Sequence, residues 1–409
     1  MKILMLTPYP PYPPDSGGRI RQWEQIRYFG SRHDLTVLGF AFSQEEYDRR
    51  RMLDGLCAEA LILRHPQEQR YRGQDPADLN LPWPLRWFYT DEMRNTIQRL
   101  KASQFDCVLI EYIFMSPYLD LFSCPAVLHE QNIESSLYKQ YAEVPERKQG
   151  NSKSKDRLFW HATWMMMAQY ENQTWPKFPL RIAVSSADKE EMDARCVEGK
   201  TVVIENGVNA ENATVISQHD SNKILFMGSM DYYPNVDAAF HLVKHIMPHV
   251  WKRNPAISVR IVGRNPQKSI LDLGSDPRVE VIANPANMRE VAEGCALSVV
   301  PLRMGGGTRI KILDSMAMGL PVISTSLGCK GLSLTNGQHL LTSDDPVRFA
   351  EHILQVLDEP QLKEFLSRQG RALVEAKFGW RTMFERMEQE LLQLVDCQSL
   401  SNTSGIVEQ

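Results

Sequence analysis

The chain has 409 residues, a formal net charge of −4, 43% apolar residues and 23% charged residues. The length exceeds what one ordinary hydrophobic core accommodates, so two domains are expected, and the composition is typical of a soluble globular protein. The charge balance argues against nucleic acid as a partner, and seven scattered cysteines without a C-x-x-C pair indicate neither a zinc site nor a disulfide framework.

The first apolar run, in MKILMLTPYPP, is too short for a signal peptide, and no stretch has the roughly 18 apolar residues of a membrane-spanning helix. We therefore expect a cytoplasmic protein. The stretch LFWHATWMMMAQY (158–170), with Trp160 and Trp164, follows the basic segment RKQGNSKSK (147–155). It is compatible with peripheral contact at the inner membrane face, and equally with ordinary core packing.

Short apolar, β-branched runs alternate with helical patterns along both halves of the chain. Continuous apolar runs are typical of buried parallel strands, and their alternation with helices indicates βαβ units in a doubly wound sheet. The predicted strands are residues 2–8, 35–42, 60–64, 107–112, 126–130, 181–186, 201–207, 223–229, 258–264, 279–284, 297–302 and 321–326.

The strand pattern starts again at Lys223, after the polar stretch NAENATVISQHDSN (209–222). We predict an α/β protein with two Rossmann-like domains that face a central cleft. The first would comprise residues 1–210 and be completed by a C-terminal helix at 378–397, and the second would comprise residues 223–377. Ligands of such sheets bind beyond the carboxyl ends of the strands, so the loops after the strands are the candidate sites.

Two glycines, Gly17 and Gly18, follow the first predicted strand and precede a helix. Their amide groups are candidates for a diphosphate or acceptor contact, and the alternative is a plain turn before a helix. His129 ends a strand further along, where it could hydrogen-bond a transferred sugar or simply be structural. Gly228 and Asn284 end strands of the second domain and are candidates for contacts to the nucleotide.

The segment RMGGGTRIKILDSMAMGLPVIST (303–325) places three glycines before a helix. Free N–H groups at a helix N-terminus favour an anion, and glycines let it approach the backbone closely. We expect Thr308 to be the N-cap and Arg309 to reach the mouth of the site. Lys311 and Asp314 are three residues apart and share a helix face, so one can bind phosphate and the other ribose hydroxyls. A tight loop before a solvated, basic helix start is the alternative, and the motif is neither a P-loop nor G-x-G-x-x-G.

In chain order, these segments resemble the family 4 glycosyltransferases, which have the GT-B fold. The resemblance covers nearly the whole chain. It is carried by PPDSGGRIRQWEQIRYF, AVLHEQNIES, RIAVSSADKEEM, VVIENGVN, ILFMGSMDYYPNVDAAFHLV, VRIVGRNP, PLRMGGGTRIKILDSMAMGLPVIST and FGWRTMFERM.

The resemblance implies a retaining transferase that moves a sugar from a UDP- or GDP-sugar to a saccharide or lipid-linked acceptor in polysaccharide or glycoconjugate synthesis. It implies neither a cofactor nor an obligatory metal, consistent with the lack of a D-x-D triplet. The catalytic candidates are His129, Arg309 and Lys311. The donor-binding candidates are Gly17, Gly18, Gly228, Asn284, Gly305, Gly306, Gly307, Thr308 and Asp314.

The sequence departs from the family pattern at two places. The family carries two glutamates eight positions apart, where this chain has Gly306 and Asp314. The family also often has an arginine and a lysine after the first donor-domain strand, where this chain has Ser229 and Asn235. Two alternatives therefore stay open: a nucleotide-sugar-binding protein without turnover, and a sugar-nucleotide epimerase of the same fold.

Overall fold

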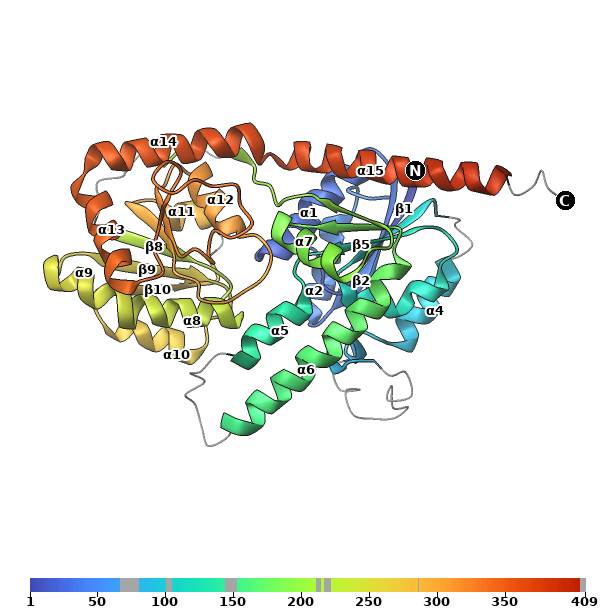
Figure 1. Ribbon diagram of the computed structural model, residues 1–409, viewed down its shortest axis with the longest axis horizontal. Coiled ribbons are helices and arrows are strands. Elements are labelled where there is room, and N and C mark those ends of the chain that lie inside the picture. The colour runs from blue at the N-terminus through green and yellow to red at the C-terminus, as the bar shows by residue number, and fades with distance from the viewer. Residues whose placement is uncertain are drawn as a thin grey trace. The chain divides into compact units, whose positions relative to one another are not determined.

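The computed structural model describes residues 1–66, 81–100, 105–143, 153–210, 215–216, 222–285 and 287–404 (Figure 1). The chain forms two compact units. The first consists of Met1–Pro14, Gly18–Glu205 and Phe384–Gln409, and the second consists of Asp15–Gly17 and Asn206–Met383. The basic segment at 147–152 and most of the polar stretch expected at the domain boundary lie outside the described residues.

The first unit is built on a seven-stranded sheet whose neighbouring strands are all parallel. Its central strands are buried along nearly their whole length, as continuous apolar runs require when helices cover both faces. In spatial order the strands are β3 (Glu59–Arg64), β2 (Asp34–Ala41), β1 (Lys2–Thr7), β4 (Cys107–Glu111), β5 (Ala126–Glu130), β6 (Leu180–Ala183) and β7 (Lys200–Val203).

The helices of this unit up to α7 connect consecutive parallel strands, and the connection from β5 to β6 contains two of them, α5 and α6, which lie side by side (Figure 1). The helices are α1 (Gly17–Gly30), α2 (Gln44–Asp48), α3 (Trp83–Arg86), α4 (Asp91–Leu100), α5 (Glu134–Glu143), α6 (Lys153–Thr174) and α7 (Ser186–Arg195), with 3₁₀ turns at Arg49–Leu53, Ile113–Leu121 and Trp175–Lys177.

The second unit has a six-stranded sheet, again with all neighbouring strands parallel. In spatial order its strands are β10 (Val279–Ala283), β9 (Ser258–Gly263), β8 (Lys223–Met227), β11 (Leu297–Val300), β12 (Val322–Ser324) and β13 (Leu341–Thr342). Its helices are α8 (Tyr233–His241), α9 (Met247–Arg253), α10 (Lys268–Leu271), α11 (Met288–Ala292), α12 (Ile310–Ala317), α13 (Pro346–Asp358) and α14 (Pro360–Lys377), with a 3₁₀ turn at Asp272–Ser275.

The two Rossmann-like units confirm the predicted α/β fold class, and each of the twelve predicted runs overlaps a strand. The sequence missed β13, whose two residues are too few to show a pattern. The helical pattern at 235–250 is interrupted by a π-helical turn at Leu242–Ile246. Pro248, near the start of α9, explains this break because its ring has no N–H and collides with the preceding helical turn.

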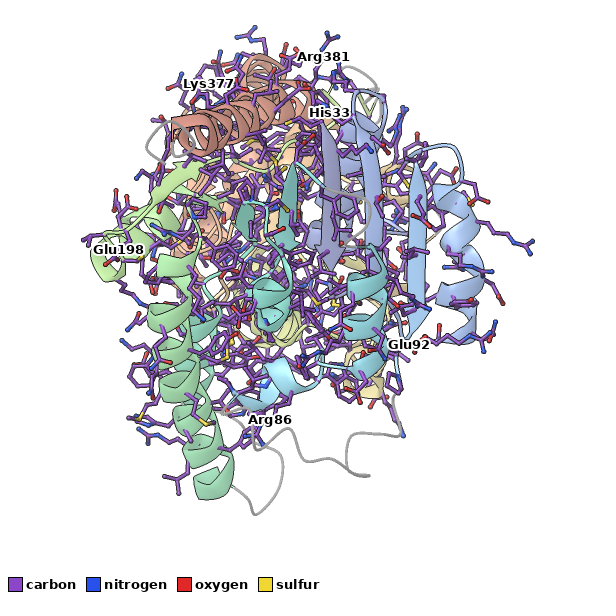
Figure 2. All side chains as sticks on the ribbon, turned by 90° about the vertical axis from the view of Figure 1, so that its right-hand side faces the viewer. His33, Arg86, Glu92, Glu198, Lys377 and Arg381 are labelled. Atoms are coloured by element: carbon purple, nitrogen blue, oxygen red, sulfur yellow. The ribbon has the colours of Figure 1, made fainter. Side chains whose placement is uncertain are left out.

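The C-terminal helix α15 (Trp380–Ser404) packs on α1 within the first unit from Phe384 onwards. The Glu388 carboxylate accepts a hydrogen bond from the Tyr28 hydroxyl at 2.7 Å and lies 2.6 Å from Nε2 of His33, which is labelled in Figure 2. The ring of Phe384 contacts those of Tyr28 and Phe29. Within the described part of the chain, we find no helix with the length and apolar character needed to cross a membrane.

Candidate functional site

In each sheet the carboxyl ends of the parallel strands lie along one edge, and several of the predicted site residues follow strands there. In the first unit, β4 ends at Glu111 and β5 pairs with it so that Glu111 and His129 are direct neighbours. The register therefore brings together two polar side chains that are far apart in the sequence.

His129 and Glu111 form a buried pair, with Nδ1 of His129 2.8 Å from Oε2 of Glu111 and both side chains fully buried. The other Glu111 oxygen accepts a hydrogen bond from the Gln25 amide of α1 at 2.7 Å. Burial raises the pKa of Glu111, but His129, Gln25 and Arg21 outweigh it, so the net pKa is lowered. Burial also lowers the pKa of His129. The pair therefore consists of a carboxylate and a neutral imidazole.

This charge state decides the tautomer of His129. A carboxylate has no proton to give, so Nδ1 of the neutral ring carries the hydrogen and faces Glu111, and Nε2 carries a lone pair. Both ring nitrogens of His129 are buried: Nδ1 lies 2.8 Å from Oε2 of Glu111 without the alignment of a hydrogen bond, and Nε2 has no hydrogen-bond partner within the described residues. His129 therefore offers an acceptor, suited to a ligand hydroxyl.

Gly18 lies in the first turn of α1, directly beside Tyr112. A Cβ atom at Gly18 would lie 2.0 Å from the Tyr112 hydroxyl, so only glycine leaves room for that side chain. Tyr112 has a left-handed backbone with φ of 64°, and its N–H donates to the His129 carbonyl at 2.9 Å. The close approach to Tyr112 thus gives Gly18 a packing role, and Gly17 is the first residue of α1.

Two further carboxyls follow His129 in the chain: Glu130 is the last residue of β5, and Glu134 is the first residue of α5. Glu130 accepts from the indole N–H of Trp175 and the backbone N–H of Ile113, both at 3.3 Å, and burial together with Glu171 and Glu134 raises its pKa well above the ordinary value. Burial, reinforced by Glu171, raises the pKa of Glu134 to about 8. Burial and the neighbouring acids thus favour the neutral form of both carboxyls.

In the second unit, the glycine loop follows β11 and leads into α12. Gly305 and Gly307 have φ of 129° and 65°, a region in which residues with a Cβ are strained. Arg309 folds back on this loop: its Nη1 donates to the carbonyl of Gly307 at 2.8 Å and to that of Gly306. The Arg309 side chain is 9% exposed, so part of its role is to fix the conformation of the loop.

The expectation that Thr308 caps α12 is wrong. The N-cap residue is Arg309, without a capping side-chain bond. The Thr308 hydroxyl instead accepts from the Asn206 amide at 2.7 Å. This bond links the glycine loop to the segment after β7, so the Thr308 side chain is turned away from the helix end.

Lys311 lies in the first turn of α12 and reaches toward the end of β8. Its Nζ donates to Oδ1 of Asn235 at 2.6 Å and lies 5.2 Å from the centre of the Phe226 ring. Gly228 lies against both polar side chains, because a Cβ there would be 2.7 Å from Asn235 and 2.8 Å from Nζ of Lys311. The structure thus brings Gly228 and Lys311 together around Asn235.

Lys311 and Asp314 both have strongly shifted pKa values. Burial, with a smaller contribution from Arg309, lowers the pKa of Lys311 to about 7. Burial alone raises the pKa of Asp314 to about 7. The two groups lie on α12 next to the glycine loop, so this region contains an ammonium whose charge an anionic ligand would stabilise.

Asn284 directly follows β10, two strands away from β8, in a left-handed conformation with φ of 48°. Its side-chain oxygen accepts from the backbone N–H of Asn265, which follows β9, at 2.9 Å. The side chain therefore fixes the two neighbouring loops to each other.

The structure gives the predicted residues separate partners within each unit. In the first unit His129 pairs with Glu111, and Gly18 lies against Tyr112. In the second unit Gly228 and Lys311 contact Asn235, and Arg309 binds the glycine loop. From the sequence, Asn235 is only a position where the family's charge is missing, and Glu111 is not among the predicted site residues. The sequence could have indicated Glu111, because it lies near the end of a predicted strand, as His129 does. Tyr112, Gln25 and Arg21 carried no signal in the sequence.

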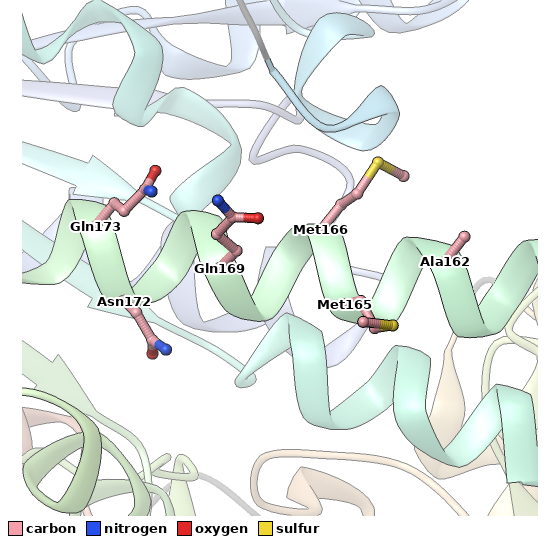
Figure 3. Close-up of a pocket in the computed structure, with 6 residues that line it drawn as sticks. All are labelled: Ala162, Met165, Met166, Gln169, Asn172 and Gln173. Atoms are coloured by element: carbon pink, nitrogen blue, oxygen red, sulfur yellow. The ribbon is translucent and has the colours of Figure 1, made fainter.

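A surface pocket of about 720 Å³ lies on α6, and Figure 3 shows the residues that line it. They are Ala162, Met165, Met166, Gln169, Asn172 and Gln173. Trp160, by contrast, stacks on Tyr138 of α5, with ring centres 5.7 Å apart. As for metals, the described residues contain no group of three or more histidine, cysteine, aspartate or glutamate side chains arranged to hold an ion.

Comparison with known proteins places these features in context. Residues 221–359 match the family model described as "Glycosyl transferases group 1". An uncharacterized 44.6 kDa protein in the cps region of Klebsiella pneumoniae is 27% identical over 144 residues, which are 33% of this chain and 37% of that protein. A GDP-mannose-dependent monoacylated alpha-(1-6)-phosphatidylinositol monomannoside mannosyltransferase of Corynebacterium glutamicum is 26% identical over 153 residues, 34% of this chain and 40% of that one. The matches thus span about two fifths of these relatives.

Among solved structures, Anabaena Alr3699/HepE in complex with UDP-glucose is similar with a TM-score of 0.68 and 14% identity, over 96% of this chain and 100% of that chain. Sucrose-phosphate synthase from Thermosynechococcus elongatus is similar with a TM-score of 0.69 and 15% identity, over 97% of this chain and 100% of that one. At this identity the likeness establishes the fold. The chain therefore has the GT-B fold of two Rossmann-like units, and its second unit matches the glycosyl transferases group 1 family.

Proposed function

We propose that the protein is a retaining glycosyltransferase that moves a sugar from a UDP- or GDP-sugar to a saccharide or lipid-linked acceptor in surface polysaccharide or glycoconjugate synthesis. The observation that carries the donor assignment is Lys311, held by Asn235 beside the glycine loop in the segment that matches the family model. Two relatives support it: one was solved with UDP-glucose, and another is named as GDP-mannose-dependent.

In the proposed reaction, the bond between the sugar's anomeric carbon and the diphosphate oxygen breaks, and a bond from that carbon to an acceptor hydroxyl forms. The leaving diphosphate takes up negative charge, and the hydroxyl proton moves to it. Lys311 and the amides of the glycine loop stabilise this charge, so the proposal includes neither a cofactor nor an obligatory metal. Asp314 accepts the ribose hydroxyls, and Nε2 of His129 accepts a hydroxyl of the transferred sugar.

The proposal that the anomeric configuration of the sugar is retained rests on the resemblance to family 4. In the proposed reaction the acceptor attacks from the face that the diphosphate leaves, because the leaving group is also the base. The anomeric configuration of the product, read by NMR, tests this part of the proposal. An inverted product would overturn it without affecting the donor assignment.

One observation favours binding without turnover as the second candidate. Gly306 stands where the family carries its first acid, and its carbonyl is bound to Arg309. A sugar-contacting carboxylate is therefore missing at that position.

Two measurements separate these candidates. A thermal-shift screen with UDP, GDP, ADP and their sugars identifies the nucleotide, and a ligand at one hundred times its Kd should stabilise the protein by about 2.7 kcal/mol. Radiolabel transfer from the donor that binds then detects turnover. Binding with neither transfer nor slow donor hydrolysis supports the non-catalytic alternative, whereas interconversion of the donor without acceptor identifies an epimerase.

Peripheral contact with the inner face of a membrane is a further part of the proposal. Four apolar residues of α6 are exposed: Leu158 (69%), Met165 (59%), Phe159 (48%) and Met166 (42%). Flotation with anionic vesicles tests this contact. Binding that disappears when Met165 and Met166 are both replaced by Ser supports it, and no binding by the wild type would exclude it under those conditions.

A further inference from the structure

Three residues from separate elements meet at the end of β8. Gly228 follows the strand, Asn235 lies in the first turn of α8, and Lys311 lies in the first turn of α12. A hydrogen bond of 2.6 Å joins the Lys311 ammonium to Oδ1 of Asn235, and a Cβ on Gly228 would come within 2.8 Å of Nζ. The contact between Asn235 and Lys311 therefore requires glycine at position 228.

The orientation of the Asn235 side chain is fixed. It is 6% exposed, and its Nδ2 donates to the backbone carbonyl of Ser229 at 2.9 Å. Turning the amide over would place its NH₂ group against the Lys311 ammonium and its oxygen against a carbonyl. Oδ1 is thus directed at Lys311, whatever occupies the site.

The partner of Lys311 is a neutral amide, although charged residues lie nearby in the chain. Arg309, the N-cap residue of α12, lowers the pKa of Lys311, and Asp314 lies three residues further along the same helix. On α8 the acid Asp237 is paired with Arg303 at 2.6 Å. From β8 the Phe226 ring faces the ammonium, with its centre 5.2 Å from Nζ. Among the described residues, Asn235 is the hydrogen-bond partner found for the ammonium, so two of its three N–H donors remain for a ligand.

We propose that Asn235 is a positioning residue, which holds the Lys311 ammonium for the phosphate oxygens of a nucleoside diphosphate without neutralising its charge. A carboxylate at 235 would cancel the charge that the ligand needs, and a cation would repel Lys311. Where the family places cations after this strand, the chain thus carries a neutral group that organises a cation from α12. This inference rests on the proposed function, since it names how the same donor site is built.

The experiment compares binding of UDP with uridine, and of GDP with guanosine, by calorimetry for the wild type and three variants. Asn235→Ala removes the bond to Lys311, and Asn235→Asp preserves shape but adds a charge. Asn287→Ala is the control, because Asn287 is an exposed asparagine that caps α11 in the same unit. Circular dichroism checks that each variant is folded.

We expect Asn235→Ala to weaken diphosphate binding about tenfold, and Asn235→Asp to weaken it more, as the loss of a charged hydrogen bond implies. Nucleoside binding should change less than about twofold, as in the control. The pH at which diphosphate affinity falls should rise in Asn235→Asp, because a carboxylate stabilises the ammonium. A purely structural role would not move this midpoint.

The outcomes distinguish the inference from the proposed function. If the wild type binds none of these nucleoside diphosphates, the proposed function fails. If the wild type binds one of them and Asn235→Asp binds it equally well with an unchanged pH midpoint, only the inference is overturned. Equal losses of nucleoside and diphosphate in a folded Asn235→Ala would also overturn it.

Discussion

Nδ1 of His129 lies 2.8 Å from the Glu111 carboxylate, with both side chains fully buried, and Gln25 holds the other carboxylate oxygen at 2.7 Å. Burial lowers the pKa of His129 although Glu111 acts in the opposite direction, so the imidazole stays neutral, and the carboxylate facing Nδ1 leaves Nε2 as the acceptor. We therefore expect the function of His129 to depend on Glu111, whose two carboxylate oxygens face His129 and Gln25.

Glu111→Gln should lower turnover roughly tenfold to a hundredfold while donor affinity changes little, because supporting partners of a functional histidine typically contribute this much. The ¹⁵N shifts of His129 should change from a single tautomer to a mixture. Glu130→Gln is the matched control, since it makes the same change at a neighbouring buried carboxyl whose pKa burial raises and which contacts Trp175 and Ile113 instead of His129. Unchanged ¹⁵N shifts and turnover in Glu111→Gln would rule out this role.

Lys311→Met should stabilise the protein without ligand and abolish its preference for diphosphates. Burial disfavours the ammonium, so replacing it with an apolar side chain removes a cost of folding, and each kcal/mol gained corresponds to about 2–4 °C in Tm. Lys330→Ala, at an exposed lysine, serves as control. A lower Tm for Lys311→Met would mean that the ammonium stabilises the fold.

The Tm advantage of Lys311→Met should itself depend on pH. The pKa of Lys311 is about 7 in the folded protein and near 10.5 when unfolded, so the folding cost is constant below about pH 7 and shrinks as the pH rises toward 10.5. Thermal unfolding of the wild type and of Lys311→Met from pH 6 to 9 measures this difference in Tm. A constant difference would place the pKa of Lys311 outside this window.

Diphosphate binding should take up protons near neutral pH. An anion beside Lys311 raises its pKa, so affinity is greatest below pH 7 and falls as the pH rises through the range above it. Calorimetry in two buffers of different ionisation enthalpy counts the protons. Arginine stays protonated throughout this pH range, so Lys311→Arg should bind the diphosphate with less proton uptake. The uptake that remains in this variant measures the titration of the ligand itself, whose pKa is about 6. Equal uptake by both proteins would contradict the role of Lys311.

Asp314→Asn should remove the discrimination between the native nucleotide and its 2′,3′-dideoxy analogue. A carboxylate that accepts ribose hydroxyls favours the native ligand by roughly tenfold to a hundredfold, given charged hydrogen bonds of about 1.5–3 kcal/mol. Asp358→Asn, at an exposed residue of α13, is the control. If Asp314→Asn still discriminates as the wild type does, the ribose lies elsewhere.

Gly18→Ala should destabilise the first unit, and Tyr112→Phe should rescue it. A Cβ at Gly18 meets the Tyr112 hydroxyl at 2.0 Å, whereas the ring carbon behind that hydroxyl is 3.3 Å away. We expect Gly18→Ala alone to cost about 1–3 kcal/mol of unfolding free energy, with a coupling of about 1 kcal/mol in the double variant. Denaturant unfolding measures both, and additive effects would show that Tyr112 moves aside freely.

The sequence by itself determined the secondary structure of both sheets and the place of the glycine loop. Buried parallel strands require continuous apolar runs, so β1, β5 and β8 could be recognised locally. Loops after such strands must lie at the carboxyl edge, which is why the sequence alone was enough to propose His129 and Lys311 as site residues. The resemblance to a family added the expected chemistry.

Only the tertiary structure decided which side chains meet. The order of strands in the sheet places β4 beside β5, and the Glu111 carboxylate therefore lies beside His129. Asn235 reaches Lys311 across 76 residues because β8 and β11 are neighbours and Gly228 has no Cβ. Thr308 was misassigned as a cap because its partner, Asn206, is remote in the sequence. Hydrophobic periodicity is a local property, whereas the pairing of polar groups and the resulting pKa values depend on packing between distant segments.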